Sequence, residues 1–210
     1  MRFSRKRICT SISTWKITFS FLEHWTWKTD YSANFRMAPQ PQQRLSDDHD
    51  AVSELLKQLR TALDKTDVQT IYSRLNLLWA RLAVHIRAEH LHLFPAIAAR
   101  VTEAQSLIDS LRADHDFFMR ELAQAIGILR ELPRTISKPA DEAKLDFVRD
   151  AVREVQKRLA THNEIEEHQI YRWSSAMLSE TEQLELLAQI NAELENRPPR
   201  FSAETWQNGL

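Results

Sequence analysis

Four long segments of the chain carry apolar residues at every third or fourth position. This spacing places apolar side chains along one face of an α-helix. The predicted helices run from about Ser46 to Asp64, Val68 to Ala99, Glu103 to Leu132 and Ala140 to Met177. A capping box is predicted at Thr102 and Gln105. A shorter helix is predicted to begin at Ser179, which forms a capping box with Glu182, and to end before Pro198.

The second and fourth segments repeat one another with an offset of 77 residues. Each ends its apolar stripe with a His-x-x-x-Glu pair: His85/Glu89 and His162/Glu166. The first and third segments share the tripeptide Asp-His-Asp, which contains His49 and His115 respectively. The chain is therefore predicted to form two helical hairpins of the same design. Together they would make an all-α, up-down-up-down antiparallel four-helix bundle with a short C-terminal extra helix.

The positions of the turns indicate whether the four histidines can meet. In an antiparallel hairpin, two residues at the same depth are equally far from the turn. For the two histidines of the first hairpin the midpoint is residue 67, in the polar stretch 64–67. For those of the second hairpin it falls at Lys138 and Pro139. Turns at these places would bring all four histidines to one level of the bundle.

Composition agrees with this architecture and narrows the class of protein. Only two glycines occur, Gly127 and Gly209, which favours long helices. The single cysteine, Cys9, excludes an internal disulfide framework and a cysteine-based zinc cluster. Residues 1–37 carry a net charge of +5 and the remainder −6, and an acidic body argues against nucleic acid as a partner. No apolar run reaches the roughly 18 residues of a membrane span, so we expect a cytoplasmic protein without a membrane partner.

The N-terminal region differs from the rest of the chain. Apolar residues alternate from Trp15 to Phe21, which is typical of a strand and is not repeated after residue 45. We expect this region to be poorly ordered, either as a targeting segment or as sequence translated upstream of a true start at Met37. The predicted organisation is an N-terminal extension at 1–45, the bundle at 46–177, and a C-terminal helix and tail at 178–210.

The two His-x-x-x-Glu pairs predict a metal site inside the bundle. Residues four apart lie on one helix face, and the apolar stripe turns that face inward. Two buried carboxylates without a cation would cost several kcal/mol or become protonated. Four imidazoles and two carboxylates are too many donors for one tetrahedral zinc ion, but they suit two first-row metal ions with a position left for a small ligand.

We therefore predict a non-haem di-iron centre, with manganese or zinc as alternatives. Its expected ligands are His49, His85, Glu89, His115, His162 and Glu166. The carboxylates would bridge the two ions. The histidines of the first hairpin would serve mainly one ion and those of the second hairpin mainly the other.

Other polar and aromatic residues nearby are assigned to simpler roles. His90 and His168 lie off the inward stripe and are predicted to be solvated. His92 follows His85 by seven residues, which returns it nearly to the same face, so a place at the rim of the site is expected. Tyr171 and Trp173 are aromatic residues that could carry oxidising equivalents, but packing at the rim is the expected role.

These motifs resemble those of the hemerythrin-like domains, also called HHE cation-binding domains. The resemblance covers about residues 46–177 and rests on DHD at 48–50, HIRAEHLHLFP at 85–95, DHD at 114–116 and HNEIEEHQIY at 162–171. It implies that the same six residues are di-iron ligands, with the two glutamates bridging. Glu167 is a rival to Glu166, because oxygen-carrying members use an acidic residue five positions after the histidine.

One departure from the family bears on function. The oxygen carriers have a second histidine four residues from the first on the third helix, where this chain has Leu111 and Met119. The ion near His115 would therefore have one nitrogen donor fewer. The leading hypothesis is a protein that binds or senses oxygen or a related diatomic ligand. The alternative is an enzyme or stress protein that acts on peroxide or nitric oxide, or handles iron for repair of iron centres.

Two further architectures are alternatives to a hemerythrin-like site. A ferritin-like bundle uses paired Glu-x-x-His motifs, and Glu89 with His92 makes one match. The second match fails because Ile165 precedes His168 by three residues. A purely structural bundle without metal is the remaining possibility.

The ligand assignment predicts the outcome of four substitutions. Glu89→Ala or Glu166→Ala should remove most of the bound metal, because each would delete a bridging carboxylate. His90→Ala and His168→Ala should leave metal content nearly unchanged. Elemental analysis of the purified variants measures this, and equal losses in the two groups would contradict the assignment.

Overall fold

The computed structural model describes residues 40–208, so the predictions made for residues 1–36 concern a segment outside the described residues. Within 40–208 the chain forms helices and no strand, which confirms the all-α class. The first hairpin consists of α1 (Pro41–Asp64) and α2 (Val68–Ala88), and the second of α4 (Ala104–Glu131) and α5 (Pro139–Ile165).

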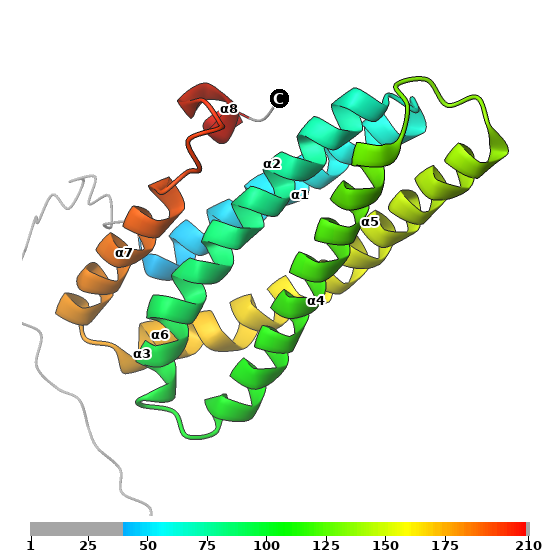
Figure 1. Cartoon of the computed structure of the whole chain (residues 1–210). Coiled ribbons are helices and arrows are strands. Elements are labelled where there is room, and N and C mark those ends of the chain that lie inside the picture. Colours follow the sequence, from blue (N-terminus) through cyan, green and yellow to red (C-terminus); the bar gives the residue numbers. More distant parts are fainter. Residues whose placement is uncertain (1–39, 209–210) are drawn as a thin grey trace, which may run out of the picture. The chain divides into compact units, whose positions relative to one another are not determined.

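These four helices surround a common core. Helix α1 packs against α2 and α5, and α4 packs against the same two helices, so the ring is closed (Figure 1). Helix α7 (Glu180–Glu195) packs outside the ring on α1 and α2. The chain ends in a short helix, α8 (Ala203–Asn208), which the apolar pattern did not predict. None of the helices within residues 40–208 has the length and apolar character needed to span a bilayer.

The second and fourth long helices each contain a π-helical segment at the same place in the repeat. Segment η1 (Glu89–Leu93) leads from α2 into α3 (Phe94–Ala98), and η2 (Glu166–Ile170) leads from α5 into α6 (Tyr171–Met177). The N–H of the residue after each segment donates to the carbonyl of its first residue, Glu89 or Glu166, which is five positions earlier. Single π turns within α-helices occur frequently at functional sites. Both turns here begin at the glutamate of a His-x-x-x-Glu pair.

One predicted helix start and one predicted capping box were wrong. Helix α1 begins at Pro41 rather than Ser46, because proline fits the first helical turn, where its missing N–H has no intrahelical partner. The extra turn buries Leu45 completely. The capping box predicted at Thr102 does not form: α4 begins at Ala104 without a side-chain cap. The carbonyl of Thr102, not its hydroxyl, accepts the Gln105 N–H.

Two other local predictions are confirmed. The Ser179 hydroxyl accepts the Glu182 N–H at 3.4 Å, and the Glu182 carboxylate accepts the Ser179 N–H at 2.8 Å, which completes the capping box of α7. The first turn lies at residues 65–67, as the midpoint of the histidines predicted. The second connection spans 132–138, so the predicted midpoint falls at its last residue.

The apolar core of the bundle is divided into two clusters by a buried polar layer. One cluster lies toward the hairpin turns and includes Val52, Leu82, Phe118 and Leu159. The other lies toward α3, α6 and α7 and includes Leu45, Phe94, Leu111 and Ile170. The residues of these clusters come from all four long helices. The polar layer between them contains the predicted metal ligands.

Core packing should dominate the stability of the metal-free fold. Leu75 in α2 is fully buried, whereas Leu184 in α7 is 51% exposed. We expect Leu75→Ala to lower the free energy of unfolding by about 2–5 kcal/mol, because it leaves a cavity. Leu184→Ala should change it by less than about 0.5 kcal/mol. Urea unfolding followed by circular dichroism measures both values, and similar values for the two variants would contradict the assigned core.

Candidate metal centre

The six predicted ligands lie together in the polar layer, and all six side chains are buried. Helices α1, α2, α4 and α5 each contribute one histidine, and the two π segments contribute the glutamates. The ligand atoms form two overlapping groups whose members lie within 4.8 Å of one another: His49/His85/Glu89/Glu166 and Glu89/His115/His162/Glu166. The two glutamates belong to both groups.

Glu89 reaches one histidine from each hairpin. Its Oε1 lies 3.3 Å from Nε2 of His85, and its Oε2 lies 3.3 Å from Nε2 of His115. The two oxygens of this carboxylate are thus directed at histidines of different hairpins.

Glu166 makes the equivalent arrangement from the opposite side. Its Oε2 lies 3.4 Å from Nε2 of His49, and its Oε1 lies 3.2 Å from Nε2 of His162. The site therefore has two halves, one with His49 and His85 and the other with His115 and His162. Both carboxylates span the two halves.

The donor atoms fit metal ions in both spacing and chemistry. Nε2 of His49 is 3.2 Å from Nε2 of His85, and Nε2 of His115 is 2.9 Å from Nε2 of His162. Two nitrogens each about 2.0–2.1 Å from one ion, at tetrahedral or octahedral angles, are about 3 Å apart. Both oxygens of Glu89 and both of Glu166 are buried without a hydrogen-bond partner among the described residues. Such carboxylates require a cation or a proton.

The pKa shifts in the metal-free site also indicate that the two carboxylates require a cation or a proton. Burial, and then the charge of Glu166, raise the pKa of Glu89. Burial also opposes ionisation of Glu166, but the charge of His162 outweighs it and holds the pKa of Glu166 well below its ordinary value. Burial lowers the pKa of His115 well below its ordinary value, so this imidazole is neutral and keeps a lone pair. Without a cation, the two carboxylates cannot both be ionised at low cost.

Each imidazole is also held at its outer nitrogen, Nδ1. Asp48 lies 3.0 Å from Nδ1 of His85, and Asp114 lies 3.3 Å from Nδ1 of His162. A partner at Nδ1 fixes the tautomer that leaves Nε2 free to bind metal. Sequence reasoning missed both aspartates as functional residues, although each is the first residue of an Asp-His-Asp tripeptide.

An arginine holds each of these aspartates in turn. Arg81 donates to Oδ1 of Asp48 at 2.8 Å, and Arg158 donates to Oδ1 of Asp114 at 2.6 Å. The two arginines are 77 residues apart, so they follow the repeat. Burial alone would raise the pKa of Asp48, but His85 and Arg81 outweigh it and lower the value to about 2. Each half of the site thus contains an Arg–Asp–His chain.

The remaining two imidazoles have different partners at Nδ1. Oε1 of Glu167 lies 3.0 Å from Nδ1 of His49, and Nε2 of His90 lies 2.9 Å from Nδ1 of His115. His90 is therefore only partly solvated, and its contact with His115 was not predicted. The expectation that His90→Ala leaves metal binding nearly unchanged is withdrawn for the same reason. Both expectations assumed an uninterrupted α-helix, whereas a π segment turns through a smaller angle per residue, which keeps the residue after Glu89 closer to the inward face.

The structure also distinguishes the six predicted metal ligands from the other glutamate and histidine side chains near them. Glu166 is fully buried between the two halves, whereas the side chain of Glu167 is 39% exposed and lies behind His49. His168 is exposed, as predicted, and one of its ring nitrogens lies 2.8 Å from the Glu164 carbonyl. His92 is half-buried and does not belong to either group of donors.

Tyr171 is closer to the site than predicted. Its side chain is buried rather than at the rim, and its hydroxyl lies 3.2 Å from Nε2 of His49. Burial, and then the charge of Glu166, raise the pKa of Tyr171 well above its ordinary value, so the phenol stays protonated. It begins α6, directly after the π segment that carries Glu166.

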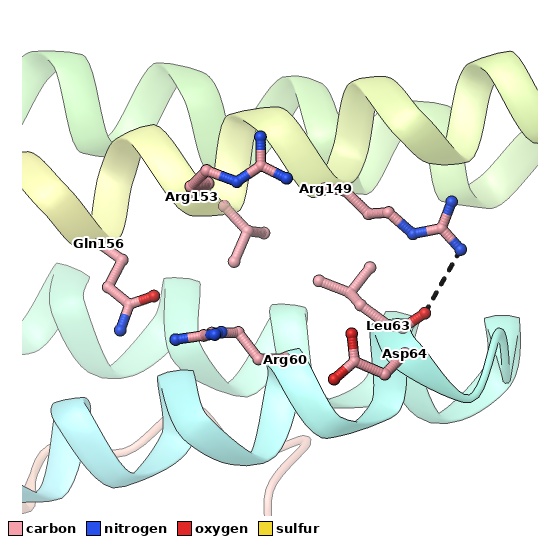
Figure 2. A pocket seen from close by; sticks show the side chains of 7 residues that line it. Arg60, Leu63, Asp64, Arg149, Arg153 and Gln156 are labelled. Atoms are coloured by element: carbon pink, nitrogen blue, oxygen red, sulfur yellow. Dashed lines mark hydrogen bonds between the residues drawn. The ribbon is translucent and has the colours of Figure 1, made fainter.

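Two cavities illustrate what kind of ligand the bundle can accept. A cavity of about 10 Å³ adjoins the polar layer, and its walls are the four histidines, Asn163 and four apolar side chains: Val52, Leu82, Ile86 and Leu159. This volume is close to the minimum of about 10–15 Å³ for one water molecule. A cavity of about 260 Å³ lies between α1 and α5 (Figure 2). It is lined by Arg60, Arg149 and Arg153, which disfavour a cation there, and Arg149 donates to the Leu63 carbonyl.

A family model described as the hemerythrin HHE cation binding domain matches residues 40–174. This range begins just before α1 and ends within α6, so it includes all six buried donors and both π segments. No curated protein and no solved structure matches the chain significantly.

The two neighbouring glutamates of the fourth helix should differ in their effect on metal. Glu166→Gln should abolish binding of two ions, because it removes the charge of a carboxylate that faces both halves. Glu167→Gln should weaken binding by about 10-fold, as is usual for a group that only orients a ligand. Titration of each purified variant with ferrous iron without oxygen measures this. Retention of two ions by the first variant and loss by the second would show that Glu167 is the bridging residue.

Proposed function

The chain belongs to the hemerythrin HHE cation-binding domain family, and on that premise we propose that it is a non-haem di-iron protein that binds or senses oxygen or a related diatomic ligand. Family membership and the two buried His/Glu groups together indicate metal-ion binding. The identity of the metal and the nature of the small ligand are the parts proposed here.

The donor set supports a pair of iron ions. Each carboxylate directs its two oxygens at different halves of the site, which suits a bridging ligand between two ions. Four imidazoles and two carboxylates are a mixture of nitrogen and oxygen donors that iron accepts well. Magnesium and calcium prefer oxygen donors, and structural zinc is satisfied by four ligands. Manganese and zinc remain the alternatives.

The cavity beside the histidines carries the proposal of a diatomic ligand. Its volume of about 10 Å³ is at the lower limit for one water molecule, so it excludes an organic substrate and leaves only the smallest ligands as candidates. Four of its walls are apolar, including the buried side chains of Val52 and Leu82. A small apolar or weakly polar gas suits such a cavity better than a charged molecule does.

The protein side chains would have distinct tasks around bound iron. The iron pair would supply the electrons and the coordination position for the small ligand. Glu89 and Glu166 would balance its charge, and Asp48 and Asp114 would hold His85 and His162 in the tautomer that binds through Nε2. The apolar clusters on either side of the polar layer would exclude bulk water and protons from the bound ligand.

A second candidate is an enzyme or stress protein acting on peroxide or nitric oxide, or handling iron for repair of iron centres. Two observations favour reactivity over simple carriage. Leu111 and Met119 supply no nitrogen near His115, so an ion in that half would have two imidazole donors, one fewer than the resemblance to the oxygen carriers implies. The protonated phenol of Tyr171 lies beside His49 and is the right chemical group to donate a proton or an electron.

Cytoplasmic location belongs to the same proposal. The single cysteine, Cys9, leaves no internal disulfide, which fits a reducing compartment. A small gas or peroxide is the partner expected there, rather than nucleic acid or a membrane.

Optical spectroscopy of iron-loaded protein tests the proposal. We expect charge-transfer bands that change when oxygen or azide is added. Val52→Phe should fill the cavity and lower the affinity for azide at least about tenfold, while iron content stays the same. If a sample with two irons per chain shows no change in its spectrum when oxygen or azide is added, ligand binding is contradicted. Rapid turnover of peroxide or nitric oxide by that sample would favour the second candidate.

A further inference from the structure

The two halves of the site are related by the internal repeat, except at a few positions. One is the pair Phe94 and Tyr171, of which only the tyrosine has a hydroxyl, 3.2 Å from Nε2 of His49. The 77-residue offset pairs His85 with His162 and Glu89 with Glu166. Arg81 and Arg158 behind these histidines follow the same offset, whereas Asp48 and Asp114, on the first helix of each hairpin, are 66 residues apart. Under this offset His90 corresponds to Glu167.

His90 and Glu167 occupy equivalent places in space as well as in sequence. Each is the second residue of a π segment, and each contacts Nδ1 of the histidine from the first helix of a hairpin. Glu167 holds His49 at 3.0 Å, and His90 holds His115 at 2.9 Å. Three of the four imidazoles thus have a carboxylate at Nδ1, and His115 alone has another imidazole.

This difference affects how strongly the nitrogen of His115 can bind a cation. For Nε2 of His115 to bind a metal ion through its lone pair, the ring proton must be on Nδ1. The Nδ1–H group then donates a hydrogen bond to Nε2 of His90. A carboxylate in that position raises the basicity of the imidazole and strengthens its bond to a metal. A neutral imidazole accepts the same hydrogen bond but does not contribute a negative charge.

The surroundings of His90 keep it in this position. Its ring lies 5.6 Å from the ring of Phe94, which in turn stacks on His115 at 6.0 Å. The side chain is half-buried between these aromatic groups and solvent. His115 is therefore held on its outer side by two rings from the same helical segment.

We propose that His90 is a positioning residue that makes the two metal positions unequal, so that the ion bound by His115 and His162 is the weaker and more exchangeable of the two. This inference rests on the proposed metal-binding function of the site. Both positions have two imidazole donors, so the difference between them comes from the group that contacts Nδ1 of His115.

Stepwise titration with ferrous iron under anaerobic conditions, in competition with a chelator, tests the inference on the full chain. Wild-type protein should bind two ions with dissociation constants that differ at least about tenfold. His90→Ala should weaken only the second step, by about another tenfold, and His90→Gln should recover part of the loss because its amide oxygen can accept the bond.

Exchanging the two residues gives the sharpest comparison. His90→Glu should tighten the second step toward the value of the first, and Glu167→His should weaken the first step toward the second. His92→Glu is the matched control, because it adds the same charge two residues away without facing Nδ1 of His115. His168→Ala controls for loss of an exposed histidine.

The outcomes separate the inference from the function on which it rests. If wild-type protein binds no iron, the proposed function fails. If it binds two ions with equal affinity, or if His92→Glu tightens the second step as much as His90→Glu does, the positioning role of His90 is contradicted. Circular dichroism of each metal-free variant distinguishes these outcomes from simple unfolding, which would change both steps together.

Discussion

The carboxylates of Glu89 and Glu166 lie together in a buried layer between two apolar clusters, where their negative charge needs a counter-charge. Glu89 and Glu166 are fully buried, and within residues 40–208 no hydrogen-bond donor satisfies their oxygens. An isolated buried charge costs several kcal/mol, and a second one nearby adds repulsion. A pair of cations satisfies both groups at once. The surrounding apolar clusters, which would make the bare carboxylates unstable, would then strengthen their attraction to the ions.

The internal repeat provides this arrangement economically. Each half contains one histidine from each helix of a hairpin, together with an Arg–Asp–His chain that reaches from the surface to the polar layer. The π segments begin at the glutamates and direct the next residue, Glu167 or His90, back toward an imidazole. This departure from symmetry, together with the pairing of Phe94 with Tyr171, gives the two halves different chemistry.

Much of the fold and of the donor set could be predicted from the sequence. Apolar periodicity gave the four long helices, and the repeat singled out the two His-x-x-x-Glu pairs from a chain with eight histidines. The midpoint between the two histidines of each hairpin coincided with a turn signal, which placed His49 level with His85 and His115 level with His162. This comparison depends only on where each hairpin turns. The structure places all six side chains together. Whether they bind iron remains a prediction.

What sequence reasoning missed has a common physical cause. A helical stripe drawn at constant angle cannot anticipate a π turn, and for that reason His90 was assigned to solvent and Tyr171 to the rim. The roles of Asp48 and Asp114 depend on contacts between helices, which local periodicity does not contain. The proline start of α1 and the absent cap at Thr102 show the usual difficulty of placing helix ends by pattern alone.

The proposed di-iron centre requires two ions that share the carboxylates of Glu89 and Glu166. Anomalous diffraction at the iron absorption edge, from crystals of the iron-loaded chain, would locate both ions. Two peaks are expected about 3.5–4 Å apart, each in contact with one oxygen of Glu89 and one of Glu166. A single peak, or two peaks away from these carboxylates, would contradict the proposed di-iron centre.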